Sequence, residues 1–142
     1  MLYNILVHAH SGLRWIVLIL LIAVILNAAS ALSRKRLSTP KDARLSLSAM
    51  LSAHIQIVIG LVLYFISPRV QFSANTMSDD QLRFFTVEHT LGMLIAIILI
   101  TIGNRKAKGG NFKSVLWYYL IALLIIVVSI PWPFRGFGNG WF

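Results

Sequence analysis

Four long apolar stretches, separated by short polar segments, account for most of the chain. They run over residues 3–32, 45–66, 82–102 and 115–130. A transmembrane helix needs roughly 20 apolar residues, and none of the stretches alternates between apolar and polar positions as a barrel strand does. Helix-ending residues lie between or after them: Pro40, Pro68, Gly109, Gly110 and Pro131. The pattern predicts an all-α fold, an integral membrane four-helix antiparallel bundle that forms a single domain over residues 1–142.

The basic residues predict how these helices are oriented. They are concentrated after the first and third stretches: Arg34, Lys35, Arg36, Lys41 and Arg44, then Arg105, Lys106, Lys108 and Lys113. The segments expected on the opposite side contain Arg69, Arg83 and Arg135. Because cytoplasmic loops carry an excess of lysine and arginine, the first and third polar segments are expected in the cytoplasm. Both termini are then expected on the outer, periplasmic side of a bacterial inner (cytoplasmic) membrane, which the chain crosses as a multi-pass protein.

The composition also favours a chain whose main partner is the lipid bilayer. Hydrophobic residues make up 58% of the sequence and charged residues 12%, against about 45–50% and about 25% in soluble domains. The two basic segments account for most of the formal net charge of +9, so no nucleic-acid partner is expected. The first apolar stretch follows no basic segment and precedes no clear cleavage site, which predicts a retained helix and not a signal peptide.

Histidines are the most plausible metal ligands, since the chain contains no cysteine. All four histidines, His8, His10, His54 and His89, fall within the apolar stretches. An ionisable residue inside a span is a candidate functional residue because placing it in lipid is costly. At 1.5 Å per residue, His10 lies roughly 9 Å and His89 roughly 3–6 Å outward from the middle of its stretch. We therefore expect these two residues at similar depths near the periplasmic leaflet.

His10 and His89 would suit the two faces of a haem b ring. Cofactors in helical bundles are held by side chains from facing helices. His8 and His10 are about 200° apart around a helix, so only one of them can face the bundle centre; His10 is preferred and His8 is the alternative. The histidines predict a haem b-binding electron-transfer protein, cytochrome b-like, with iron held by His10 and His89. No bond-making activity of its own is expected.

Two further features could complete such a site. Arg14 and the outer arginines are expected to bind the haem propionates, since arginine pairs well with carboxylates. Gly92 follows His89 on a helical face of small residues, which a flat macrocycle can approach closely.

His54 and Glu88 have less defined roles. His54 is expected to be a third polar contact in the core, a donor to a bound quinone, or a ligand of a second haem. Glu88 is expected to form an ion pair with Arg14, since a carboxylate in an apolar stretch is costly unless paired. It could instead receive protons from a quinol.

Two other functions are consistent with the same residues. One is a cofactor-free accessory subunit of a larger membrane complex, with the histidines as hydrogen-bonding groups between helices. The other is a small proton-conducting or transport module based on Arg14, Glu88 and the histidines. The electron-transfer hypothesis implies a quinone, other redox or respiratory membrane subunits, or a second copy in a homo-oligomer as partners.

The second and third stretches resemble spans of a known family. The segment AHIQIVIGLVLYFISP (53–68) resembles the Gln-x-x-x-Gly span of haem A synthases, and VEHTLGMLIAIILITIG (87–103) resembles their ligand-bearing span. Similarity to one half of a haem A synthase implies a bis-histidine haem on two non-adjacent spans, with His10 or His8 paired with His89. The stretch 115–130 has no histidine and a second half is lacking, so haem A synthesis is not expected. HAHSGLRW, FFTVEH and IPWPFRGFG are also similar to segments of small four-helix, cytochrome b-like membrane proteins of Bacteroidetes.

Overall fold

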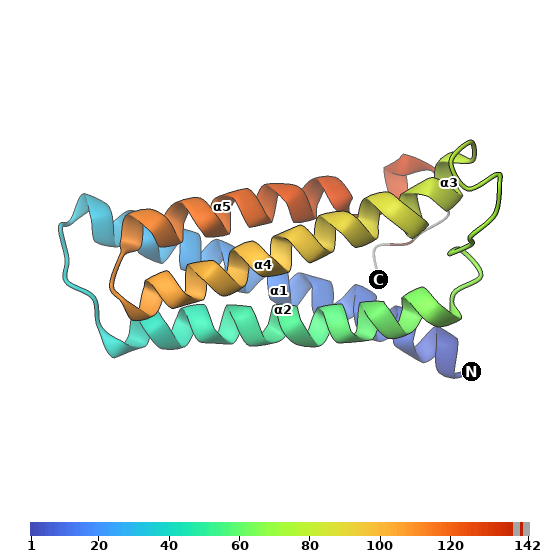
Figure 1. Ribbon diagram of the computed structural model, residues 1–142. Coiled ribbons are helices and arrows are strands. Elements are labelled where there is room, and N and C mark those ends of the chain that lie inside the picture. The colour runs from blue at the N-terminus through green and yellow to red at the C-terminus, as the bar shows by residue number, and fades with distance from the viewer. Residues whose placement is uncertain (138–139, 141–142) are drawn as a thin grey trace.

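The apolar stretches have no internal proline, and they form four long helices in the computed structural model, which describes residues 1–137 and 140 (Figure 1). The long helices are α1 (Leu2–Ser33), α2 (Pro40–Ile66), α4 (His89–Lys108) and α5 (Phe112–Ser129). A short helix α3 (Asp80–Arg83) and a π-helical turn η1 (Phe84–Glu88) extend α4 at its start, and a 3-10 turn η2 (Pro133–Arg135) follows α5. No strand occurs in the described residues.

Four segments are long and apolar enough to cross a membrane: α1, α2, α5 and the continuous segment Asp80–Lys108. The prediction of an all-helical fold with four helices able to cross a membrane is confirmed at this level. Large apolar side chains such as Ile19, Val58 and Leu124 are more than half exposed on the outside of the bundle. Extensive exposed apolar surface of this kind marks contact with a membrane or a partner.

The two strongly basic segments lie at the same end of the bundle. The connection between α1 and α2 and the connection between α4 and α5 are both at that end (Figure 1). The start of α1, the segment between α2 and α3, and η2 are at the other end.

A capping box begins α2 next to one of these basic segments. Thr39 is the N-cap, Pro40 is the first helical residue, and Asp42 accepts hydrogen bonds from the backbone N–H and hydroxyl of Thr39 at 2.7 and 2.8 Å. The Asp42 carboxylate also accepts from Arg36 and from Asn27 of α1, each at 2.8 Å. These bonds tie the end of α1 to the start of α2, and the contact with Asp42 raises the pKa of Arg36 above its usual value.

A buried polar cluster joins α2, α4 and α5 in the half of the bundle near the basic connections. The hydroxyl of Tyr119 donates to the backbone oxygen of Ser46 at 3.0 Å, and the Ser46 hydroxyl donates to Oδ1 of Asn104 at 3.1 Å. Gly103 makes room for this arrangement, because a Cβ at that position would lie 2.7 Å from the Tyr119 ring. Small residues and hydrogen-bonded polar side chains are typical of helix contacts within membranes.

Candidate cofactor-binding site

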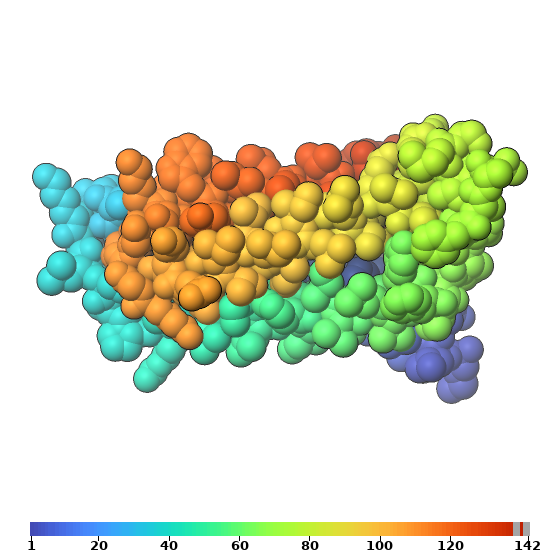
Figure 2. Space-filling view, viewed as in Figure 1, coloured from blue at the N-terminus to red at the C-terminus, as the bar shows by residue number. Residues whose placement is uncertain are grey.

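A cavity of about 440 Å³ lies in the other half of the bundle, near the segment between α2 and α3. Side chains of α1, α2, α4 and α5 form its wall, and Figure 2 shows α1 through a gap between α2 and α4. Cofactor pockets are commonly about 300–1,000 Å³, mostly apolar, with a few placed polar groups. The histidines and arginines in this wall are His8, His10, Arg14, Arg69 and His89.

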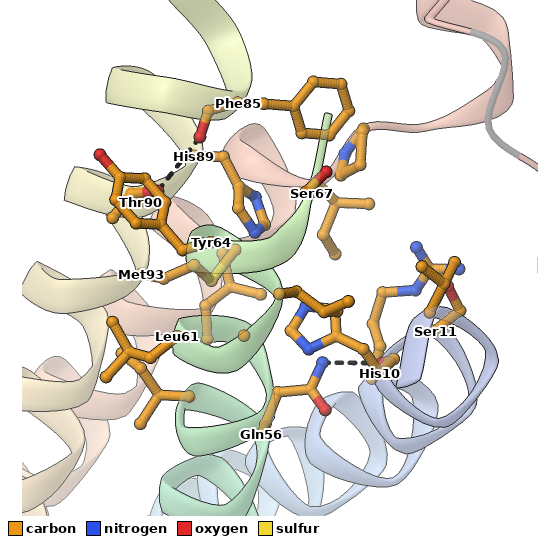
Figure 3. A pocket seen from close by; sticks show the side chains of 18 of the residues that line it. His10, Ser11, Gln56, Leu61, Tyr64, Ser67, Phe85, His89, Thr90 and Met93 are labelled. Atoms are coloured by element: carbon orange, nitrogen blue, oxygen red, sulfur yellow. Dashed lines mark hydrogen bonds between the residues drawn. The ribbon is translucent and has the colours of Figure 1, made fainter. Parts of the chain in front are cut away.

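His89 enters the cavity from the first position of α4, directly after η1 (Figure 3). Its Nδ1 lies 2.7 Å from the backbone oxygen of Ser129, the last residue of α5. That carbonyl is available because α5 ends at Ser129 and Ile130 is extended, so no backbone N–H one turn further on bonds to it. A carbonyl only accepts, so the ring donates Nδ1–H and a neutral His89 keeps its lone pair on Nε2. The bond holds the tautomer and orientation that a metal ligand needs.

His10 reaches the cavity from α1, and its ring lies against Gly60 of α2. A Cβ at position 60 would be 3.0 Å from Cε1 of His10, so a larger residue would displace the ring. Nδ1 of His10 is buried and has no hydrogen-bond partner among the described residues. Since buried polar atoms nearly always have a partner, His10 is short of one hydrogen bond.

The rings of His10 and His89 approach each other, with centroids 6.3 Å apart and planes inclined at 73°. A metal–imidazole bond is about 2 Å and the ring centre lies about 1 Å beyond the nitrogen, so two imidazoles on opposite sides of one ion have centres about 6 Å apart. The angle between the planes does not alter this spacing. The described residues, 1–137 and 140, contain no group of three or more histidine, cysteine or acidic side chains that could hold a metal ion. The 6.3 Å between the ring centres of His10 and His89 is close to the spacing of two imidazoles that share one ion.

Gln56 supports His10 from the same helix as Gly60. Its Nε2 donates to the backbone oxygen of His10 at 2.8 Å, and its Oε1 is buried without a hydrogen-bond partner in the described chain (Figure 3). Residues four apart lie on the same helical face, so Gln56 and Gly60 both face α1. The Gln-x-x-x-Gly pattern of the second apolar stretch contains both residues, but the sequence does not predict their contact with His10. The spacing of one amide and one glycine in an apolar helix was the available signal.

Arg14 and Arg69 both line the cavity. Arg14 is buried on α1, and its guanidinium lies 5.4 Å from the ring centroid of Trp15 and 5.7 Å from that of Trp132. The guanidinium of Arg69 lies 5.3 Å from the ring centroid of Phe85. A guanidinium on an aromatic face keeps its N–H groups at its edge, where a carboxylate can accept from them. Two positive charges therefore adjoin the histidine pair.

The other two outer arginines are not part of the cavity wall. Arg83 forms ion pairs with Asp80 and Glu88, each at 2.8 Å. Arg135 lies over the ring of Phe84, 4.8 Å from its centroid.

The predicted ion pair between Glu88 and Arg14 is wrong. The Glu88 carboxylate is about half exposed and accepts from Nε of Arg83, five residues earlier. Hydrogen bonds in a π-helical turn join residues five apart, so η1 brings positions 83 and 88 to the same side of the segment. The Glu88 carboxylate therefore has a partner in its own segment, because of a π-helical turn that the apolar pattern of the sequence does not predict.

The remaining candidate residues have different positions. His8 lines the cavity but is exposed. His54 lies outside the cavity wall, with its Nδ1 2.8 Å from the backbone oxygen of Met50. Gly92 also lies outside the wall and is packed against the side chain of Ser129. Its contribution is indirect, because the close approach of α5 at Gly92 brings the Ser129 carbonyl to His89.

No protein-family model, curated protein or solved structure matches the chain.

Proposed function

We propose that this protein is a haem b-binding electron-transfer protein of the membrane, in which His10 and His89 would hold the haem iron. The observation that carries the proposal is the pair of imidazole rings 6.3 Å apart in a cavity between four helices. Bound haem would supply one-electron oxidation and reduction. The protein would set the reduction potential of the haem through the ligands, their hydrogen bonds and their burial.

Each residue around the pair has a role that supports this proposal. The Ser129 carbonyl holds His89 with Nε2 available for the iron. Gly60 leaves room for the His10 ring. Arg14 and Arg69 place two positive charges in the cavity wall, which would attract the propionate carboxylates.

The orientation in the membrane is part of the proposal. An antiparallel bundle with the basic connections in the cytoplasm places both termini and the histidine pair toward the periplasmic leaflet of a bacterial inner membrane. A quinone in the bilayer, or another redox subunit, would then exchange electrons with the site. The shared position of the two basic connections at one end of the bundle supports this orientation.

The proton-conducting alternative receives less support. Its acidic residue, Glu88, forms an ion pair with Arg83 and does not line the cavity.

The test is a reduced-minus-oxidised absorption spectrum of the protein purified in detergent from haem-sufficient cells. We expect a sharp α-band that is lost in His10→Ala and in His89→Ala. His8→Ala and His54→Ala are matched controls, since His8 is exposed and His54 lies outside the cavity, and both should retain the band. Soluble imidazole should restore the low-spin spectrum of His89→Gly by entering the space left by the ring.

A folded, colourless wild-type protein would overturn the proposal and would favour a cofactor-free accessory subunit. A haem spectrum that persists in both His10→Ala and His89→Ala would show that other residues bind it.

A further inference from the structure

We infer that a groove beside the histidine cavity binds a quinol from the bilayer, with the hydroxyl oxygens of Tyr64 and Thr90 accepting hydrogen bonds from the quinol ring. The inference rests on the proposed function, since a lipid-soluble electron carrier is the donor that such a protein would use. It assigns both a place and a redox form to that carrier.

The groove lies between the end of α2, the start of α4 and the segment that joins α2 to α3, and its volume is about 660 Å³. Val87, Leu91 and Leu94 line it and are 37%, 55% and 40% exposed. Exposed apolar side chains on a membrane-crossing segment mark contact with lipid. A ligand could therefore enter from the bilayer and rest an apolar tail on these side chains.

The groove and the histidine cavity share a wall. Tyr64, Thr90 and Leu94 line both spaces. Thr90 directly follows His89 on α4, and Figure 3 shows both residues at the cavity. A molecule in the groove would thus be separated from the cavity by one layer of side chains.

The wall of the groove is polar but uncharged. Among the residues that the structure describes, those lining the groove include no acidic or basic side chain, and the hydroxyl groups belong to Tyr64, Ser73, Thr76, Thr86 and Thr90. A phospholipid headgroup carries a phosphate charge, which is costly to bury without a cation beside it. A neutral polar ring with an apolar tail suits this wall better, and quinols have that chemistry.

The hydroxyl groups of Tyr64 and Thr90 already use their protons. Tyr64 donates to the backbone oxygen of Thr86 at 3.1 Å, and Thr90 donates to the backbone oxygen of Phe85 at 3.2 Å. A hydroxyl group has one proton and two lone pairs, so both oxygens can still accept. A quinol has two O–H donors, whereas a quinone has only carbonyl acceptors. The groove should therefore bind the reduced form more tightly.

The π-helical turn η1 fixes the direction of these hydroxyl groups. Phe85 and Thr86, whose carbonyls accept the two protons, both belong to the turn. Turns of this kind are frequent at functional sites. One local feature therefore turns two hydroxyl groups into acceptors at the same wall.

The experiment is photolabelling of the purified protein in detergent with an azide-bearing benzoquinol that has a decyl tail, followed by mass spectrometric mapping. We expect the label on residues 72–77 or 86–94. Unlabelled decyl-benzoquinol should compete at a concentration about tenfold or more below that of its quinone, as two hydrogen bonds between neutral groups predict.

Leu91→Trp should abolish the labelling, because a large ring at this position fills the groove. Ile98→Trp is the matched control. It lies seven residues further on the same helix, is 58% exposed and does not line the groove.

Thr90→Val retains the side-chain shape and removes one acceptor. It should weaken competition by the quinol about 2–12-fold and leave competition by the quinone unchanged. Thr101→Val is the matched control, since the Thr101 hydroxyl also donates to a backbone oxygen of α4, that of Ile97 at 2.7 Å, and lines neither space.

The outcomes separate this inference from the proposed function, because labelling and the haem spectrum are independent measurements on one sample. A haem-containing protein that quinol and quinone protect equally, or whose Thr90→Val variant matches the wild type, overturns the inference alone. Protection by a phospholipid as strong as that by quinol also overturns it and shows a general lipid site. A haem-free protein that binds quinol in the groove overturns the proposed function and supports the groove. If Leu91→Trp fails to fold, the comparison of Thr90→Val with Thr101→Val decides.

Discussion

Gly60 of α2 and His10 of α1 are in direct contact: a Cβ at position 60 would lie 3.0 Å from Cε1 of the His10 ring. The glycine and the imidazole come from different helices, so their contact couples the packing of α1 on α2 to the position of a ring in the cavity. Gly60 therefore controls the space available to one member of the histidine pair.

Gly60→Ala should weaken haem binding by about 10–100-fold, since overpacking a close contact costs about 1–3 kcal/mol. Gly12→Ala is the matched control, because a Cβ there has no neighbour within 4 Å. Alanine should stabilise that position by about 0.5–1 kcal/mol through its greater helix propensity. Haem titration of the two purified variants measures the effect, and equal affinities would contradict this role for Gly60.

Gly92→Ala should destabilise the protein by about 1–3 kcal/mol, because its methyl group would meet the Ser129 side chain. Ser129→Gly removes that obstacle and should restore part of the loss in the double variant. Thermal unfolding of the wild type, both single variants and the double variant gives the coupling energy. Strictly additive effects would show that α4 and α5 do not depend on this contact.

Arg69→Leu should lower the affinity for haem by about tenfold or more, because a hydrogen bond to a charged group contributes about 1.5–3 kcal/mol. The loss should disappear with haem dimethyl ester, which has no carboxylates. Arg83→Leu is the control, since Arg83 lies outside the cavity and pairs with acidic residues. An equal loss for haem and its ester would mean that Arg69 acts by packing and not by charge.

Tyr119→Phe should reduce stability by about 1–3 kcal/mol and leave the haem spectrum unchanged. The hydroxyl donates to the backbone oxygen of Ser46, and its removal leaves that buried cluster with one donor fewer. Tyr118→Phe is a neighbouring control in a less buried position. Thermal unfolding in detergent measures both variants, and a spectral change in Tyr119→Phe would contradict the separation of this cluster from the histidine cavity.

The helices were predictable because span length and apolar composition depend only on local sequence. The sequence predicted the start of α2 and the end of α4 less accurately. These helices extend to Pro40 and Lys108, which lie outside the apolar stretches. Polar caps and charged last turns extend a helix beyond its apolar part.

That His10 and His89 lie close together was predictable from the sequence, but the contacts around them were not. The helical rise per residue, counted along the first and third apolar stretches, suggested that His10 and His89 lie at similar depths. The partner of Glu88 and the contact of Gln56 with His10 depend on helix rotation, which a few degrees of tilt or one extra residue in a turn can change.

The π-helical turn η1 sets a constraint on chain length that membrane thickness does not require. Thr86 lies within this turn, and its backbone oxygen accepts a hydrogen bond from Tyr64 at 3.1 Å. His89 directly follows the turn, and its ring is hydrogen-bonded to the backbone oxygen of Ser129. Each residue of an α-helix adds 100°, so loss of one residue here would rotate one contact away from its partner while the segment still crossed the bilayer. Relatives that share the histidine pair should therefore tolerate insertions between α2 and α3 but conserve the number of residues between these two contacts.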